Sequence, residues 1–258
     1  SRYVPASIST SSTGTHLIYQ AIDLQTHQQG ALKKWLLDSN TSRSNRLTQL
    51  DKVIEAAKKL QKLQHPSLLP IRDAFIENDD GYIVTEWMEG SNLQTLLTET
   101  SYGFEARKVS DILSQIIDLL SYLRQQGYSN WQFQPDHLIY QSNGTVYFLT
   151  PALLSQTQNT SSLPYLAPEI LQGQPLSEKS DTFSLGVLAY YLLTKRFPYK
   201  VEGRDTIYGI STVVPPTCIH ALIPVEFEKM VLKTLLPSPE KRPLPTEAFQ
   251  QEFENEKN

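Results

Sequence analysis

The chain has 258 residues, which is long enough for one large domain or two small lobes with a substantial buried core. Its 40% hydrophobic and 19% charged residues exclude a disordered chain. A net charge of −4 argues against a nucleic-acid binder with a basic face. The composition therefore predicts an ordinary globular protein.

The cysteine content and hydropathy bear on the compartment. Cys218 is the single cysteine, so an internal disulfide is excluded and a reducing, cytoplasmic environment is favoured. The longest apolar runs are shorter than the roughly 18 residues that a membrane-spanning helix needs. We therefore expect no membrane contact by this domain itself.

The first third of the chain reads as a small sheet with one helix. Residues 16–24 and 29–37 carry strand-type apolar residues on either side of a polar turn. Residues 45–64 have apolar residues at helical spacing. Residues 67–87 then predict two strands joined by an Asn-Asp-Asp-Gly turn.

After residue 90 the predicted elements change from strands to helices. Residues 92–99 and 109–126 predict helices, and residues 183–193 are apolar on every side, which is typical of a helix buried at the centre of a domain. We predict an N-lobe over residues 1–85, a hinge over 86–91 and a C-lobe over 92–258, within one domain spanning 1–258.

The segment "NWQFQPDHLIY", residues 130–140, stands between a predicted helix and a predicted hairpin. Farther along, residues 163–199 read "LPYLAPEILQGQPLSEKSDTFSLGVLAYYLLTKRFPY", and "SPEKRP" follows near the C-terminus. The longer segment closely resembles the end of the activation segment and the next helices of eukaryotic-type protein kinases, with Ala167, Pro168 and Glu169 as the Ala-Pro-Glu motif.

The resemblance covers nearly the whole chain and implies an α+β, bilobal protein-kinase-like fold with a small β-rich N-lobe and a larger α-helical C-lobe. It also implies structural roles for Asp181 in the buried helix and for an ion pair of Glu169 with Arg242. "YIVTEWMEG", residues 82–90, resembles the hinge, with Thr85 at the back of the nucleotide pocket.

The same alignment indicates a degraded catalytic machinery. Gln132 stands where the family has its base Asp, and an amide cannot accept a proton at neutral pH. His137 replaces the metal-binding Asn and Gln134 replaces the phosphate-contacting Lys. Thr150 replaces the Asp of the Asp-Phe-Gly motif, offering Mg²⁺ a neutral hydroxyl. The glycine loop keeps only one nearby glycine. We expect no catalytic residues, no metal site and no cofactor.

Part of the nucleotide pocket is expected to persist. Lys33 stands at the position of the family's phosphate-binding strand Lys, and Glu55 is its candidate helix partner, although family spacing would place Ala56 there instead. Glu86 and Met88 could offer hinge hydrogen bonds. The alternative is that Lys33 and Glu55 form a structural ion pair or are merely solvated.

The function predicted from these residues is that of a pseudokinase, an inactive regulator or scaffold that binds one or more unidentified proteins. Nucleotide binding would be weak or absent and independent of Mg²⁺. Two alternatives remain open: a nucleotide sensor that binds without turnover, and a kinase-like enzyme with unorthodox phosphoryl-transfer chemistry.

Overall fold

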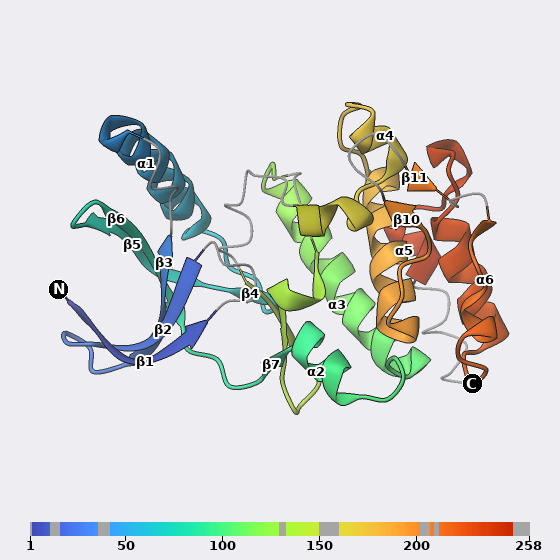
Figure 1. Cartoon of the computed structure of the whole chain (residues 1–258), viewed down its shortest axis with the longest axis horizontal. Helices are drawn as coiled ribbons and strands as arrows, with labels where there is room; N and C mark the ends of the chain where they lie inside the picture. The colour runs from blue at the N-terminus through green and yellow to red at the C-terminus, as the bar shows by residue number, and fades with distance from the viewer. Residues whose placement is uncertain are drawn as a thin grey trace. The chain divides into compact units, whose positions relative to one another are not determined.

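A computed structural model of the chain describes residues 2–10, 16–35, 42–128, 133–149, 160–201, 207–208 and 212–249. The chain divides into two compact units, one formed by residues 1–89 with 147–155 and the other by residues 90–146 with 156–258. The fold is α+β, with strands concentrated in the first unit and helices in the second (Figure 1).

Unit 1 is built on an antiparallel sheet with strand order β1-β2-β3-β6-β5. The elements are β1 (Tyr3–Thr10), β2 (His16–Asp23), β3 (Gln29–Trp35), α1 (Arg43–Leu60), β4 (Leu68–Leu69), β5 (Ile71–Glu77) and β6 (Asp80–Glu86). The strands and helix predicted for this region are confirmed, and β1 is an additional strand that pairs with β2.

The turn between β5 and β6 was predicted from its Asn-Asp-Asp-Gly sequence. Asn78 and Asp79 have φ of 52° and 63°, the left-handed region that a two-residue hairpin turn requires and that Asn and Asp tolerate. The exposed Arg43 at the start of α1 donates to both carboxylate oxygens of Asp79, at 2.8 and 3.0 Å. The turn is thereby tied to α1.

The two faces of this sheet are covered differently. On one face Tyr3, Leu32 and Val84 are buried in a cluster with Phe75, whose ring stacks on Tyr3 at 5.7 Å. On the other face α1 packs so closely that a side chain at Gly81 would lie 2.6 Å from Leu50. The paired residues Lys33 and Ile83 belong to this second face, because Trp35, two residues from Lys33, pairs with Gly81.

Unit 2 is mostly helical. Its elements, with β9 shared across the division, are β7 (Ser91–Asn92), α2 (Leu93–Glu99), α3 (Ala106–Gln125), the 3₁₀ helix η1 (Pro135–His137), β8 (Leu138–Tyr140), β9 (Val146–Leu149), η3 (Thr160–Tyr165), α4 (Pro168–Leu171), α5 (Glu178–Thr194), β10 (Lys200–Val201), β11 (Ile207–Tyr208), η5 (Pro216–Cys218), α6 (Val225–Thr234) and η6 (Pro239–Lys241).

Helix α5 lies at the centre of unit 2, as the apolar run over 183–193 predicts. Nearly every residue from Ser180 to Thr194 is buried. The helix begins with a capping box between Ser177 and Ser180. Gly186 allows α6 to approach, because a Cβ there would lie 2.0 Å from the Thr234 hydroxyl oxygen. This close contact fixes α5 against α6 and, with it, the first turn of α5 that carries Asp181.

Among the described residues, no helix is both long and apolar enough to cross a lipid bilayer.

Candidate functional site

The site residues expected in unit 1 lie on β3 and β6. Lys33 pairs with Ile83, and Ala31 pairs with the buried Thr85, so these four side chains share one face of the sheet. The Lys33 ammonium lies 5.0 Å from the centre of the Trp35 ring, a distance typical of a cation–π contact. Lys33 is half-buried, which places a positive charge on the α1-covered face of the sheet.

Glu55 does not behave as expected. Its side chain is 69% exposed on α1, and its carboxylate binds Lys59 one turn later at 2.8 Å. Here the side chain points to solvent and forms an i,i+4 pair on its own helix, so the pairing of Glu55 with Lys33 stays a prediction. Ala56, the alternative at the same alignment position, is half-buried.

At the end of β6, two residues were predicted to offer hydrogen bonds to a nucleotide. The Glu86 carboxylate binds the Arg72 guanidinium at 3.2 Å, and the Glu86 carbonyl accepts a hydrogen bond from the Thr85 hydroxyl at 3.2 Å. Met88 is half-buried. Because the Glu86 carboxylate is engaged, the backbone groups of this segment are the better candidates for contacts with a flat heterocycle.

The end of the loop "NWQFQPDHLIY" is described from Phe133 onward. Phe133, Gln134 and Pro135 are buried, and Asp136 and His137 are half-buried in the single turn of η1. Pro135 begins this turn, where its missing N–H costs nothing. Gln132 and Thr150 lie outside the described residues, as do residues 11–15 of the predicted glycine-loop region.

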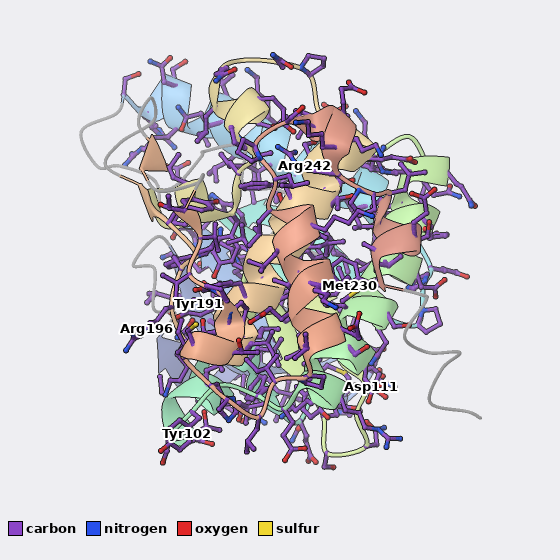
Figure 2. The ribbon with its side chains drawn as sticks, turned by 90° about the vertical axis from the view of Figure 1, so that its right-hand side faces the viewer. Tyr102, Asp111, Tyr191, Arg196, Met230 and Arg242 are labelled. Carbon is purple, nitrogen blue, oxygen red and sulfur yellow. The ribbon has the colours of Figure 1, made fainter. Side chains whose placement is uncertain are left out.

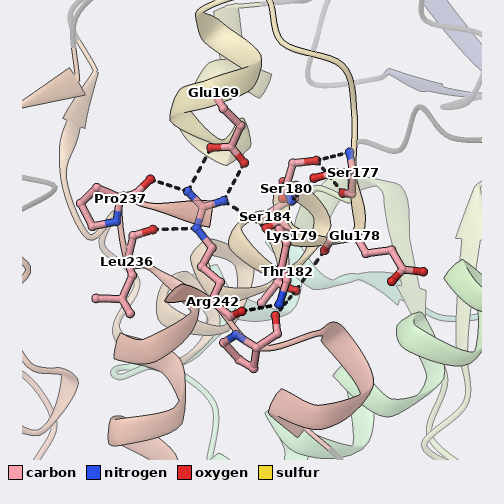
Figure 3. Close-up of polar contacts among 11 residues, drawn as sticks. Glu169, Ser177, Glu178, Lys179, Ser180, Thr182, Ser184, Leu236, Pro237 and Arg242 are labelled. Atoms are coloured by element: carbon pink, nitrogen blue, oxygen red, sulfur yellow. Dashed lines mark hydrogen bonds and ion pairs between the residues drawn. The ribbon is translucent and has the colours of Figure 1, made fainter. Parts of the chain in front are cut away.

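The structure brings Glu169 and Arg242 together inside unit 2 (Figure 3). The Arg242 side chain is fully buried, and its guanidinium donates to both Glu169 carboxylate oxygens, at 2.6 and 3.0 Å. It donates three further hydrogen bonds, to the carbonyls of Leu236 at 2.6 Å, Pro237 at 2.8 Å and Lys179 at 3.0 Å. All five N–H donors of the guanidinium thus have acceptors.

Asp181 pairs with an arginine that the sequence did not single out. The carboxylate of Asp181 binds Arg124 at the end of α3 through a charge-assisted hydrogen bond. Burial raises the pKa of Asp181 to about 6, because desolvation of its carboxylate outweighs the opposing effect of the Arg124 guanidinium. The pair joins the C-terminal end of α3 to the first turn of α5.

A metal site would need several acidic or imidazole donors in one place. Within the described ranges, no three His, Cys, Asp or Glu side chains are grouped as a metal site would require. Asp136 and His137 are neighbours in η1 and supply one carboxylate and one imidazole. These two donors alone do not make up a magnesium site.

Sequence reasoning missed an aromatic cluster in unit 2. Tyr165 in η3, Tyr191 in α5 and Phe197 after α5 have ring centroids 4.7 to 6.5 Å apart. The signal was present in "YYLLTKRFPY", where rings recur just beyond the end of the buried helix. The cluster could have been predicted by noting the aromatic residues at the C-terminal end of the buried helix, where α5 reaches the surface.

Comparison with known proteins bears on the whole chain. The family described as "Protein kinase domain" matches residues 12–254. The probable serine/threonine-protein kinase CA_C1728 of Clostridium acetobutylicum is 25% identical over 95% of this chain and 38% of its own length. Serine/threonine-protein kinase PrkC of Bacillus subtilis is 28% identical over 58% of this chain and 24% of its length.

The fold has a solved counterpart. The crystal structure of Rad53 residues 1–466 in complex with AMP-PNP superposes with a TM-score of 0.75 and 22% identity, over 96% of this chain and 64% of that one. The chain therefore spans well under half of the length of these curated relatives, and about two thirds of the solved structure.

These comparisons contradict the prediction of an inactive pseudokinase. Both curated relatives are named as serine/threonine protein kinases, and neither name describes a non-catalytic scaffold. The prediction treated the combined substitutions at Gln132, His137 and Thr150, together with the loss of the glycine loop, as decisive. Phosphoryl transfer depends mainly on positioning and charge stabilisation, which several groups share, so these substitutions do not by themselves establish inactivity.

Proposed function

Because the chain belongs to the protein kinase domain family, we propose that it transfers the terminal phosphoryl group of a nucleoside triphosphate to a Ser or Thr hydroxyl of a protein. The names of its relatives support this reaction, and Rad53, whose fold it shares, was solved with the triphosphate analogue AMP-PNP. The proposal concerns this domain, since the relatives are longer proteins.

The observation that carries the proposal is the position of Lys33. A triphosphate brings about four negative charges, and a lysine that contacts them is a recurring part of kinase sites. Lys33 lies on the sheet face shared with Ala31 and the buried Thr85. This face offers small or apolar side chains to a heterocycle, with a cation two residues farther along β3.

The reaction requires little covalent chemistry from the protein. The substrate hydroxyl oxygen attacks the terminal phosphorus, the bond to the leaving diphosphate breaks, and the hydroxyl proton is released to solvent. In the loose transition state little proton transfer is needed before the bond forms. Gln132 lies outside the described residues, and its amide can accept a hydrogen bond but cannot take a proton.

The test is phosphoryl transfer from radiolabelled ATP to a mixture of Ser- and Thr-containing peptides. Lys33→Ala is expected to lower the rate by about 10²-fold or more, as removal of a charge-stabilising donor does. The matched control is Lys34→Ala, because Lys34 is the next residue of β3, faces the other way and binds Asp80 at 2.6 Å. Absence of transfer by the unmodified chain, with every divalent cation supplied, would refute the proposal.

A second experiment addresses the amide at the base position. If Gln132 only orients the hydroxyl, Gln132→Asp supplies a proton acceptor and is expected to raise kcat by about 10²-fold, the low end of what general-base catalysis contributes. Gln132→Asn, which keeps the amide and shortens the side chain, is the control. A Gln132→Asp variant no faster than the unmodified chain would show that this residue does not face the hydroxyl.

A further inference from the structure

Arg72 lies at the start of β5, where the ladder between β5 and β6 is irregular. Its two neighbours in β5 pair with consecutive residues of β6, so Arg72 is the extra residue of a β-bulge. A bulge re-aims a side chain relative to the regular alternation of its strand. The Arg72 carbonyl accepts a hydrogen bond from the Gln61 side chain at 2.6 Å, so the bulge is also tied to the end of α1.

The bulge lies beside the point where β6 leaves the sheet. Glu86, the last residue of β6, pairs with Gly30 of β3 on one side. On the other side the ladder with β5 ends one residue earlier, at the pair of Ile71 with Thr85. The residue before β5 is Pro70, which has no N–H to donate. Strand β5 therefore cannot extend its ladder to Glu86 with a further backbone donor.

The Arg72 side chain makes contacts where this ladder stops. Its guanidinium donates to the Glu86 carboxylate at 3.2 Å and to the backbone carbonyl of Gln29, at the start of β3, at 3.0 Å. One side chain of β5 thus joins the end of β6 to β3. The side chains of Arg72 and Glu86 are 30% and 43% exposed, so their ion pair contributes little to the free energy of unfolding. Its main effect is expected on the position of the chain that follows β6.

This contact lies on the face of the sheet opposite the one proposed for the nucleotide. Side chains alternate along β6, so Glu86 shares the face of the buried Val84. Thr85 shares the other face with Ala31. The Thr85 hydroxyl donates to the Glu86 carbonyl at 3.2 Å, so that oxygen can be reached from the face of Ala31. Arg72 can therefore fix the Glu86 backbone without occupying the nucleotide face.

We propose that Arg72 is a positioning residue for the base of the nucleotide. Residues 87–89 belong to no strand, so the direction in which they leave β6 depends on how Glu86 is held. The Arg72 guanidinium holds the end of β6, and with it the backbone of residues 86–88, in the geometry that hydrogen-bonds a flat heterocycle. This inference rests on the proposed function, because it concerns the binding of the same phosphoryl donor.

The experiment separates the base from the phosphates. Displacement of a fluorescent ATP derivative gives the dissociation constants of adenosine, which lacks phosphates, and of inorganic tripolyphosphate, which lacks the base. Arg72→Gln should weaken adenosine binding about fivefold and leave tripolyphosphate binding unchanged, because a smaller fraction of the chain then has the hinge in the binding geometry. Lys33→Ala should have the reverse effect. Adenosine bound no more weakly by Arg72→Gln than by the unmodified chain would overturn the proposal.

Steady-state kinetics gives a second readout, which a purely structural role would not produce. Contacts with the base are equally strong in the ground state and the transition state, so Arg72→Gln should raise KM for ATP about fivefold and leave kcat unchanged. A lower kcat with an unchanged KM would refute the positioning role.

Two exposed arginines serve as matched controls. Arg43→Gln breaks the pair with Asp79 at the other end of the β5–β6 hairpin. Arg196→Gln changes an arginine that Figure 2 shows at the edge of unit 2, pointing outward beside Tyr191. Both variants should keep the adenosine affinity and the KM of the unmodified chain. A rise in KM equal to that of Arg72→Gln in either control would show that the effect is not specific to Arg72.

Two further variants test the same contact without depending on the stability of Arg72→Gln. Arg72→Lys keeps a cation that can reach one of the two acceptors but lacks the planar fork, so it should recover part of the adenosine affinity. Glu86→Gln keeps an acceptor of the same size without the charge and should weaken adenosine binding about twofold. If Arg72→Gln melts at a lower temperature, an unchanged adenosine affinity in Glu86→Gln would overturn the proposal.

The outcomes separate this inference from the proposed function. If Arg72→Gln weakens adenosine binding but the unmodified chain transfers no phosphoryl group, the positioning role stands and the proposed reaction fails. If the unmodified chain transfers the phosphoryl group and Arg72→Gln has the same KM for ATP, the reaction stands and the positioning role fails.

Discussion

Two ion pairs expected from the same family resemblance have opposite outcomes in the two units. In unit 2, Glu169 and Arg242 are buried and bound to each other through two hydrogen bonds. In unit 1, Glu55 was expected near Lys33, yet its carboxylate binds Lys59 on the surface of α1. The difference teaches that a family resemblance predicts an ion pair well where both side chains are buried and must bind each other. It predicts an ion pair poorly where both side chains are exposed, because water can solvate either charge.

The physical reason lies in the cost of an unpaired charge. A buried guanidinium without acceptors is so unfavourable that the surrounding backbone is arranged to supply them, as the carbonyls of Leu236, Pro237 and Lys179 do for Arg242. An exposed carboxylate incurs no such cost, because water replaces a missing partner. Glu55 is therefore free to bind whichever cation its own helix presents.

The first prediction breaks the buried pair and has the largest expected effect. Arg242→Ala should lower the free energy of unfolding by about 3 to 5 kcal/mol, because the Glu169 carboxylate is left buried without a counter-charge. Urea denaturation followed by circular dichroism measures this. Lys241→Ala, at the exposed neighbouring position, is the control and should leave the midpoint unchanged. Equal midpoints for the two variants would show that the pair does not stabilise unit 2.

The second prediction concerns Asp181, whose pairing with Arg124 does not fully offset burial. Its pKa of about 6 is raised above the usual value, so the native state holds this proton more tightly than the unfolded state. The contribution of Asp181 to stability is therefore greatest below about pH 4, the usual pKa of an Asp, and is lost as the pH rises through 6. The loss is on the order of 3 kcal/mol, at about 1.4 kcal/mol for each pKa unit.

The measurement compares the free energy of unfolding of the unmodified chain with that of Asp181→Asn between about pH 4 and about pH 7. The unmodified chain should lose stability relative to the variant as the pH rises across this range, whereas other carboxylates titrate alike in both proteins and cancel. A constant difference would mean that Arg124 keeps the pKa of Asp181 near its usual value.

Helices, strands and turns were predicted from the sequence better than the ion-pair partners of the charged side chains. Strands β2 and β3, the turn at Asn78 and Asp79, and the buried helix α5 follow from local patterns that tertiary structure reinforces. The strands, the turn and the buried helix are encoded in apolar periodicity and turn residues, which can be interpreted without knowing their neighbours in space. The kinase-like fold was predicted from the family resemblance, which covers nearly the whole chain.

The site was less predictable, because its partners come from segments far apart in the sequence. Arg124 meets Asp181 from 57 residues away, and Tyr191 meets Gln94 from 97 residues away. Neither pairing has a local signature. Glu55 falls where the spacing to α1 leaves one residue of ambiguity, and the error over catalytic activity arose from taking the combined substitutions at the family's catalytic positions as proof of inactivity.

The last and smallest expected effect tests the exposed pair. Glu55→Ala should not measurably shift the denaturation midpoint, because surface pairs of this kind are screened by water and salt. It should also leave the rate of phosphoryl transfer close to that of the unmodified chain, in contrast to Lys33→Ala, because the Glu55 carboxylate is occupied by Lys59. A loss of rate similar to that of Lys33→Ala, without loss of stability, would show that Glu55 leaves Lys59 and supports Lys33 when nucleotide binds. That result would restore the partner expected from the resemblance.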